Sequence, residues 1–270
     1  MKKLKLGIIG CGTIGTEIAV QVKKHLSNEM TVQAIYDTDQ EAINKLKKRI
    51  RGVSSKKTAE EVFQDCEIVA EAATSAIVKD MLFLAYKNST DIMIMSVGGV
   101  LGNESILKKL DNKNIKVYMP SGALAGIDAI KAAGCANISS VTLVTKKPPK
   151  GLEGAFYIEK NKIDLKKIRK ETVIFSGNVK EAIKGFPKNI NVSAILSLAG
   201  IGVKRTFVKI VVVPGSSVNS HEIIAEGDFG KIISRTENVP SPANPKTSYL
   251  ASLSAIATLR GIVKNVKIGT

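Results

Sequence analysis

The sequence contains no tryptophan, and aromatic residues make up only 4% of its 270 residues. Proteins that bind single-stranded nucleic acid without sequence preference stack the bases on aromatic side chains. With so few aromatic residues we do not expect a nucleic-acid-binding protein, although the net charge is +16. The lysines are spread over many segments, so we interpret the charge as a solvated surface that helps to attract an anionic substrate.

Long hydrophobic runs are also missing. A membrane-spanning helix needs about 20 consecutive apolar residues, and the longest candidate stretch, Val192 to Val203, is interrupted by two serines and two glycines. The N-terminal Met1-Lys2-Lys3 is followed by Lys5 and several glycines, which leave no hydrophobic region of a signal peptide. We therefore expect neither a signal peptide nor an association with membranes.

Cysteine and histidine are rare. The three cysteines, Cys11, Cys66 and Cys135, have no metal-site spacing, and an odd number of thiols cannot all pair. We therefore predict a cytoplasmic protein with reduced thiols and no bound metal. The two histidines, His25 and His221, leave few candidates for an acid or base that works near neutral pH.

One stretch organises the first part of the chain. The apolar run from Leu4 to Ile9 predicts a buried strand, and the six residues after it fit the pattern G-x-G-x-x-G. Apolar residues then recur every four positions, which predicts a helix. A strand, a glycine turn and a helix in this order are typical of dinucleotide-binding folds, in which backbone amides bind the pyrophosphate. The predicted cofactor contacts are Gly10, Cys11, Gly12, Thr13, Ile14 and Gly15.

An acidic residue follows the next predicted strand. The run from Val32 to Tyr36 leads into Asp37, about 20 residues after the last glycine, where an acid binds the hydroxyls of the adenosine ribose. A carboxylate there repels a 2′-phosphate, so we expect NAD to be preferred and NADP to be tolerated. The alternative is that Asp37 only caps the helix that follows it.

Strands and helices alternate through about residue 119. Further strands are predicted at 67–72, 91–95 and 115–119, which indicates an α/β fold with a doubly wound parallel Rossmann sheet over residues 1–120. Small and polar residues follow the strand at 67–72, and ligands of open α/β sheets bind at the carboxyl ends of strands. We therefore add Ala73 and Thr74 to the predicted cofactor site.

The pattern changes after residue 120. Strands at 140–146 and 206–213, an apolar helix at 192–198 and a hairpin of 221–225 with 231–235 predict a second, α+β domain over residues 121–243. The remaining segment, 244–270, contains a predicted helix at 246–259. We expect this C-terminal helix to pack back on the first domain.

Six segments together resemble the L-aspartate dehydrogenase family. The first, the glycine turn at 10–15, is generic to dinucleotide folds, whereas the others and their order are specific. These are Pro-Ser-Gly-Ala-Leu-Ala-Gly-Ile-Asp at 120–128, Lys-Lys-Pro-Pro at 146–149, Phe-Pro-Lys-Asn-Ile-Asn-Val at 186–192, Asn-Ser-His-Glu-Ile at 219–223 and Pro-Ala-Asn-Pro-Lys-Thr-Ser at 242–248. The resemblance covers nearly the whole chain.

The resemblance implies an NAD- or NADP-dependent oxidoreductase and often a homodimer formed through the second domain. The enzyme would convert L-aspartate to iminosuccinate, which hydrolyses to oxaloacetate and ammonia or supplies NAD biosynthesis. The catalytic histidine of the family falls on His221, and its cofactor contacts fall on Ala123 and Asn189. Ala123 would contribute only its backbone, as an amide at the start of a helix.

The chemistry suits a histidine, because a base with a pKa near neutrality must deprotonate the substrate amine. We expect the rate to rise with pH through that pKa, and a backbone carbonyl rather than Glu222 to orient the ring. From its position alone, however, His221 is an ordinary half-exposed strand residue. His25 lies near the end of the first helix, where a cation complements the helix dipole, and we interpret it as a surface residue.

The two carboxylates of aspartate call for cationic or amide donors. The candidates are Lys146, Lys147, Asn191, Asn244 and Lys246, and the alternative is that they are solvated loop residues. Asn189 and Asn191 precede an apolar helix, so either could serve only as its N-cap.

Two other classes of function fit the same architecture. One is a related enzyme, such as a homoserine dehydrogenase or a dihydrodipicolinate-type reductase. The other is a non-catalytic NAD(H)-binding sensor that contacts nucleic acid through its basic surface. Hydride transfer measured with each substrate distinguishes these hypotheses.

Overall fold

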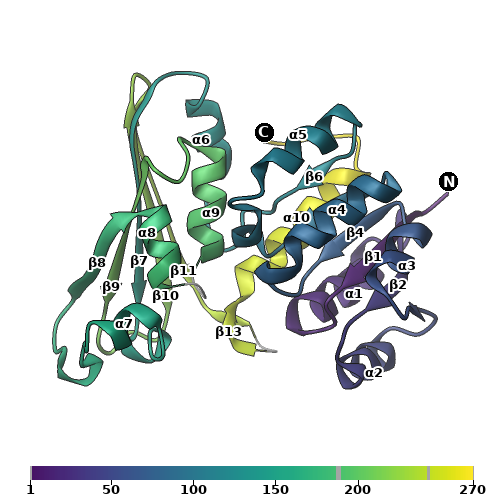
Figure 1. Cartoon of the computed structure of the whole chain (residues 1–270), viewed down its shortest axis with the longest axis horizontal. Helices are drawn as coiled ribbons and strands as arrows, with labels where there is room; N and C mark the ends of the chain where they lie inside the picture. The colour runs from purple at the N-terminus through teal and green to yellow at the C-terminus, as the bar shows by residue number, and fades with distance from the viewer. Residues whose placement is uncertain (1, 187–189, 242–243, 270) are drawn as a thin grey trace. The chain divides into compact units, whose positions relative to one another are not determined.

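The computed structural model describes residues 2–186, 190–241 and 244–269 (Figure 1). The chain divides into two compact units, each with a sheet of its own. Unit 1 comprises Met1–Pro120 and Ser252–Lys267, and unit 2 comprises Ser121–Ala251 and Ile268–Thr270. Within the described part of the chain, no helix has the length and apolar character needed to cross a membrane.

Unit 1 contains a six-stranded sheet in the order β3-β2-β1-β4-β5-β6, in which every neighbouring pair is parallel. The predicted doubly wound Rossmann sheet is thus confirmed. The strand order reverses between β1 and β4, and ligands of such sheets bind at the carboxyl edge beside this reversal. The strands are β1 (Leu4–Ile9), β2 (Met30–Tyr36), β3 (Ser54–Ser55), β4 (Ile68–Glu71), β5 (Asp91–Ile94) and β6 (Val117–Tyr118).

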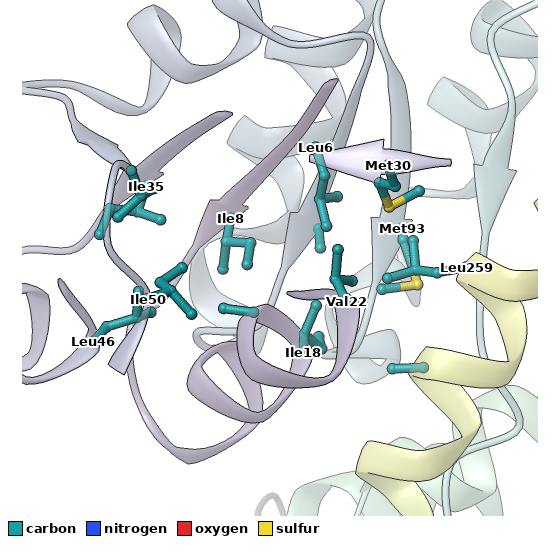
Figure 2. Close-up of a cluster of buried hydrophobic side chains, with 14 of the residues drawn as sticks. Leu6, Ile8, Ile18, Val22, Met30, Ile35, Leu46, Ile50, Met93 and Leu259 are labelled. Atoms are coloured by element: carbon teal, nitrogen blue, oxygen red, sulfur yellow. The ribbon is translucent and has the colours of Figure 1, made fainter. Parts of the chain in front are cut away.

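Helices cover both faces of this sheet (Figure 1). One face packs against α1 (Thr13–His25), α2 (Gln40–Arg49) and α10 (Tyr249–Val263). The other carries α3 (Ala59–Asp65) and α4 (Val78–Asn88), with α5 (Glu104–Asn112) beside α4. Figure 2 shows Leu259 of α10 in the same cluster of buried side chains as Val22 and Met93. The C-terminal helix therefore packs back on the first sheet, as predicted.

Unit 2 contains a mixed five-stranded sheet in the order β11-β10-β7-β9-β8, and α8 and α9 contact it. Only β7 and β9 run parallel. The strands are β7 (Ile138–Lys147), β8 (Thr172–Asn178), β9 (Thr206–Val212), β10 (Asn219–Gly227) and β11 (Gly230–Asn238), and the helices are α6 (Ile127–Ala133), α7 (Phe156–Lys160), α8 (Val179–Gly185) and α9 (Ile190–Ala199). The predicted α+β character of this part is confirmed.

One local prediction was wrong, and one strand was not predicted. The helix predicted at 246–259 begins only at Tyr249, because residues Asn244–Ser248 form β13, which pairs with β12 (Pro240–Ser241). Ser248 also donates a hydrogen bond from Oγ to Asn238 Oδ1 at 2.9 Å, which ties it to the end of β11. Strand β8 was not predicted, because its serine, glycine and asparagine are typical of a turn and it lies at the edge of the sheet.

Candidate functional site

The glycine turn joins β1 to α1 and packs closely on its surroundings. Gly10 has a φ of +96°, and a Cβ there would lie 2.6 Å from the carbonyl of Ala72. A Cβ on Gly15 would lie 1.8 Å from the Gly10 carbonyl oxygen, so α1 approaches the turn more closely than any side chain permits. By contrast, a Cβ on Gly12 would have nothing within 4 Å. The turn therefore leaves open space where a pyrophosphate would approach the backbone.

The start of α1 fits an anion. Gly12 is the N-cap residue, no side chain caps the helix, and its first turn contains no acidic residue. The partial positive charge at this helix terminus is therefore not neutralised by the helix's own residues. Thr13 and Ile14, which follow Gly12, are only partly buried. These features match the predicted pyrophosphate contacts.

Asp37 lies at the carboxyl end of β2 beside the glycine turn. Its Oδ2 accepts a hydrogen bond from the Cys11 amide at 2.6 Å, and its Oδ1 accepts one from the Asp39 amide at 2.9 Å. Asp39 caps α2, since its carboxylate accepts from the amides of Glu41 and Ala42. The alternative that Asp37 is only the helix cap is therefore wrong.

Cys11 can contribute only its backbone to a cofactor site. Its side chain is 3% exposed. Burial, followed by the charges of Asp37 and Asp39, raises the pKa of the thiol to about 12. The thiol therefore stays protonated and is a poor nucleophile.

The loops after β4 and β5 are joined by a buried acid that the sequence reading did not select. Glu71 is 0% exposed, and its carboxylate accepts hydrogen bonds from the Ala73 amide at 2.8 Å, the Ser96 amide at 3.0 Å and Ser96 Oγ at 2.9 Å. Burial raises its pKa. The sequence feature that could have identified Glu71 is an acidic residue at the end of an apolar strand. The acid holds Ala73 and the exposed Thr74 at the same sheet edge as the glycine turn.

In unit 2, His221 lies on β10 opposite Thr145 of β7. It is only 6% exposed, so the expectation of a half-exposed histidine was wrong. Its Nδ1 lies 3.0 Å from Thr145 Oγ1, so the orienting partner is a threonine hydroxyl rather than a backbone carbonyl or Glu222. Burial, followed by the charge of Lys147, lowers the pKa of His221 to about 3. The imidazole is therefore neutral at physiological pH.

The two adjacent lysines at the end of β7 face opposite sides of the sheet. Lys146 lies opposite Ser220 in the register, and its Nζ lies 2.5 Å from Glu171 Oε1. Lys147 lies on the same face as Thr145, because residues two apart on a strand share a face. Of the two lysines, Lys147 is therefore the one that shares a face with Thr145 and His221. His25, the other histidine, is exposed at the end of α1, as expected.

A small cavity lies on the His221 side of the sheet in unit 2. Its volume is about 10 Å³, room for little more than one water molecule, and it extends between the sheet and helices α8 and α9. Its lining consists of Leu143, Thr145, Lys147, Leu152, Ala182, Phe186, Ile190, Ser193, Val208 and Ile210. Lys147 is the one charged residue among these. Burial lowers its pKa to about 8.

The backbone of Ala123 is held in the loop before α6, not at the start of a helix as predicted. Its carbonyl oxygen accepts hydrogen bonds from Thr236 Oγ1 at 2.8 Å and from Asn238 Nδ2 at 3.1 Å. Asn191 is an exposed residue in the first turn of α9 and does not cap that helix. Asn189 and the side chains of Asn244 and Lys246 lie outside the described residues.

The structure thus brings the predicted residues together in two groups. In unit 1 the glycine turn, Asp37 and Ala73 meet at the carboxyl edge of the sheet. In unit 2 His221, Thr145 and Lys147 share one face; His221 and Lys147 were candidates from the sequence, whereas Thr145 was not. The first group suits a dinucleotide, and the second offers a neutral base beside a cation.

Two family models match the chain in succession. The NAD-binding domain of homoserine dehydrogenase matches residues 10–120, and the C-terminal domain of aspartate dehydrogenase matches residues 128–262. The L-aspartate dehydrogenase of Methanosarcina barkeri is 46% identical over 272 residues, which cover 99% of this chain and 100% of that protein.

Solved structures agree with these matches. The crystal structure of aspartate dehydrogenase from Thermotoga maritima has a TM-score of 0.77 and 28% sequence identity, and the comparison covers 99% of this chain and 100% of that one. A homoserine dehydrogenase from Thiobacillus denitrificans shares the fold alone, with a TM-score of 0.65, 12% identity and coverage of 97% and 74%. The likeness to aspartate dehydrogenases therefore extends through both units, beyond the dinucleotide-binding part.

Proposed function

Because this chain belongs to the L-aspartate dehydrogenase family, we propose that it oxidises L-aspartate with NAD to iminosuccinate. The likeness along the whole chain is the observation that carries this proposal. Iminosuccinate then hydrolyses to oxaloacetate and ammonia, or it supplies the synthesis of pyridine nucleotides. We further propose that the enzyme acts in the cytoplasm, where its three free thiols would stay reduced.

We assign most of the dinucleotide site to unit 1 and substrate binding to unit 2. NAD fits the carboxyl edge of the first sheet, because the space at Gly12 admits a pyrophosphate and Asp37 offers a carboxylate to the ribose. When bound, NAD would supply the acceptor for the hydride that leaves the substrate Cα. Ala73, Thr74, Ala123 and Asn189 are the further proposed cofactor contacts.

His221 is the proposed base. The substrate amine must lose a proton before hydride transfer, and only a neutral imidazole accepts one. If Nδ1 donates its proton to Thr145 Oγ1, the lone pair on Nε2 is available to the substrate, and the hydrogen bond fixes the ring orientation. Once this proton has passed to solvent, the same nitrogen can deprotonate the water that attacks the imine. Asn191, Asn244 and Lys246 remain proposed substrate contacts.

The direct test is NADH formation with a panel of L-aspartate, L-glutamate, L-alanine and L-homoserine. We expect turnover with L-aspartate and little with the others. L-homoserine deserves inclusion because the family model that matches residues 10–120 is that of homoserine dehydrogenase. Oxidation of L-homoserine without oxidation of L-aspartate would show that the proposal is wrong.

The cofactor preference is tested at Asp37. Asp37→Ala should lower the NAD-to-NADP ratio of kcat/KM by roughly ten-fold or more, because a 2′-phosphate no longer meets a carboxylate and the ribose loses an acceptor. NAD should be preferred and NADP tolerated by the wild-type enzyme. Steady-state kinetics with both cofactors measure the ratio.

Asp39→Ala is the matched control for this experiment. It also removes a carboxylate, two residues away, but that carboxylate caps α2. Losing the cap should lower the free energy of unfolding by about 1 kcal/mol and leave the ratio unchanged. An unchanged ratio in Asp37→Ala, or an equal change in both variants, would contradict a ribose contact by Asp37.

We also propose a homodimer formed through the sheet face of unit 2 that points away from His221. Three large apolar residues are exposed on this face: Phe207 at 50%, Val173 at 56% and Ile233 at 61%. Phe207 and Val173 lie on the neighbouring strands β9 and β8, and Ile233 lies on β11 at the other edge of the same sheet. Exposed apolar side chains that share a face typically mark a protein contact. Phe207→Glu should therefore give a monomer in light scattering. Phe83→Glu is the control: Phe83 is 56% exposed but lies on α4 and not on this face, so the variant should remain a dimer. A monomeric wild type would contradict the proposal.

A further inference from the structure

We propose that Glu71 is a positioning residue for the cofactor, whose buried carboxylate holds the loops after β4 and β5 in the arrangement that binds NAD. This inference rests on the proposed NAD site at the carboxyl edge of the first sheet, and it assigns the loop after β5 to that site as well. Glu71 is itself 0% exposed, so it acts on the cofactor through the backbone that it holds.

The carboxylate of Glu71 joins two loops that follow different strands. Glu71 is the last residue of β4, which lies between β1 and β5. Its Oε1 accepts hydrogen bonds from the Ala73 amide at 2.8 Å and from Ser96 Oγ at 2.9 Å, and its Oε2 accepts one from the Ser96 amide at 3.0 Å. Both oxygens are therefore used. Hydrogen bonds to a buried carboxylate are strong, because no water stabilises its charge.

The two loops pack closely on each other and on the glycine turn. A Cβ on Gly99, in the loop after β5, would lie 2.3 Å from the carbonyl oxygen of Ser75 in the loop after β4. On the other side, a Cβ on Gly10 would lie 2.8 Å from the Ala73 amide nitrogen. The turn and the two loops therefore form one continuous row of packed backbone. A displacement of Ala73 would be passed on to the proposed pyrophosphate site, because such close packing transmits strain.

The loop after β4 offers a polar group to a ligand. Ala73 and Thr74 are exposed, although they follow closely on the buried Glu71. Thr74 is the N-cap residue of the 3₁₀ helix Ser75–Ile77, but its side chain makes no capping hydrogen bond. Its hydroxyl can therefore bond to a cofactor. The place of this hydroxyl depends on the backbone that the bond between Glu71 and Ala73 fixes.

The test is the binding of NAD to Glu71→Gln, measured by calorimetry. The amide has nearly the shape of the carboxylate but only one acceptor oxygen, so at least one of the three donors loses its partner. The Kd for NAD should rise by roughly ten-fold or more, the usual scale for losing a charge-assisted hydrogen bond.

The two KM values separate this role from general damage. In Glu71→Gln the KM for NAD should rise with the Kd. The KM for L-aspartate at saturating NAD should stay that of the wild type, because the proposed substrate contacts belong to unit 2. Wild-type NAD affinity in a folded Glu71→Gln protein, or an equal rise in both KM values, would overturn the inference.

Thr90→Val is the matched control. Thr90 is 4% exposed and donates a hydrogen bond from Oγ1 to the Phe63 carbonyl at 3.1 Å. It precedes β5, however, and so lies at the opposite edge of the sheet from Glu71. Thermal unfolding should show that both variants are less stable than the wild type, whereas only Glu71→Gln should bind NAD more weakly. An equal loss of NAD affinity in Thr90→Val would show that affinity follows stability, and would overturn the inference.

If Glu71→Gln does not fold, Ser96→Ala decides. This variant removes one of the three donors and keeps both amides, so the Kd for NAD should rise several-fold. An unchanged Kd in Ser96→Ala would then overturn the inference. A wild-type protein that binds no NAD would refute the proposed function, whereas NAD binding that is the same in the wild type and in Glu71→Gln would refute only the role of Glu71.

Discussion

Replacing His221 with alanine should lower kcat for L-aspartate oxidation by roughly 100-fold or more, the usual scale of general acid–base catalysis. The methyl group that remains can neither accept the proton of the substrate amine nor activate the water that attacks the imine. NAD affinity should change little, because the histidine lies on the sheet of unit 2 rather than at the glycine turn. Steady-state kinetics give kcat, and fluorescence titration gives the cofactor affinity.

His25→Ala is the control, because His25 is exposed at the last residue of α1 and should be dispensable. Thr145→Val keeps the imidazole but removes the hydroxyl 3.0 Å from Nδ1, so its kcat should lie between those of the wild type and His221→Ala. Full aspartate turnover by both histidine variants would leave the dinucleotide fold intact but rule out the proposed mechanism.

The pH dependence differs from the one expected for an ordinary histidine. The sequence suggested a rate that rises with pH through a histidine pKa near 6.5, but burial and Lys147 lower the pKa of His221 to about 3. The neutral, proton-accepting form is therefore already present above about pH 3. Wild-type kcat/KM should accordingly show no limb from His221 around neutrality, and a clear limb there would contradict the buried position of the ring.

Gly12→Val should abolish most of the NAD affinity while the protein stays folded. The backbone of Gly12 has a φ of −70°, which valine adopts readily, and a Cβ there meets nothing within 4 Å. The branched side chain would instead occupy the space proposed for the pyrophosphate. Losing two charge-assisted hydrogen bonds to phosphate corresponds to about 3 kcal/mol, or roughly 100-fold in affinity.

Gly261→Val is the matched control, because a Cβ on Gly261 also has nothing within 4 Å and the residue belongs to unit 1. Titration with NAD, together with thermal unfolding, separates lost binding from lost structure. A folded Gly12→Val protein that binds NAD like the wild type would remove the basis for placing the cofactor at this turn.

The dinucleotide half of the site could be predicted because its signals are local. Strand, glycine turn and helix follow one another within about 25 residues, and their spacing alone defines the backbone geometry. Asp37 was selected for its place directly after the second strand, and the structure places it beside the glycine turn, where it accepts a hydrogen bond from the Cys11 amide.

The substrate half depends on pairings between distant segments. The burial of His221 and its contact with Thr145 follow from a register between strands 76 residues apart, which no local pattern reveals. A change of register by one residue exchanges the two faces of a strand, so Lys146 and Lys147 could not be distinguished before β7 was placed. Glu71 was overlooked for the same reason, since its partner Ser96 belongs to the loop after a different strand.

The position of α10 has a consequence for the order in which the protein matures. Ala255, Ile256 and Leu259 belong to the core that also contains Leu6, Ile8 and Met93. During synthesis the ribosome therefore releases the first sheet long before the helix that completes its core, and all of unit 2 emerges in between. Until α10 has been synthesised, the nascent chain carries an uncovered apolar surface on the part proposed to bind NAD, and chaperones are the proteins that recognise such a surface.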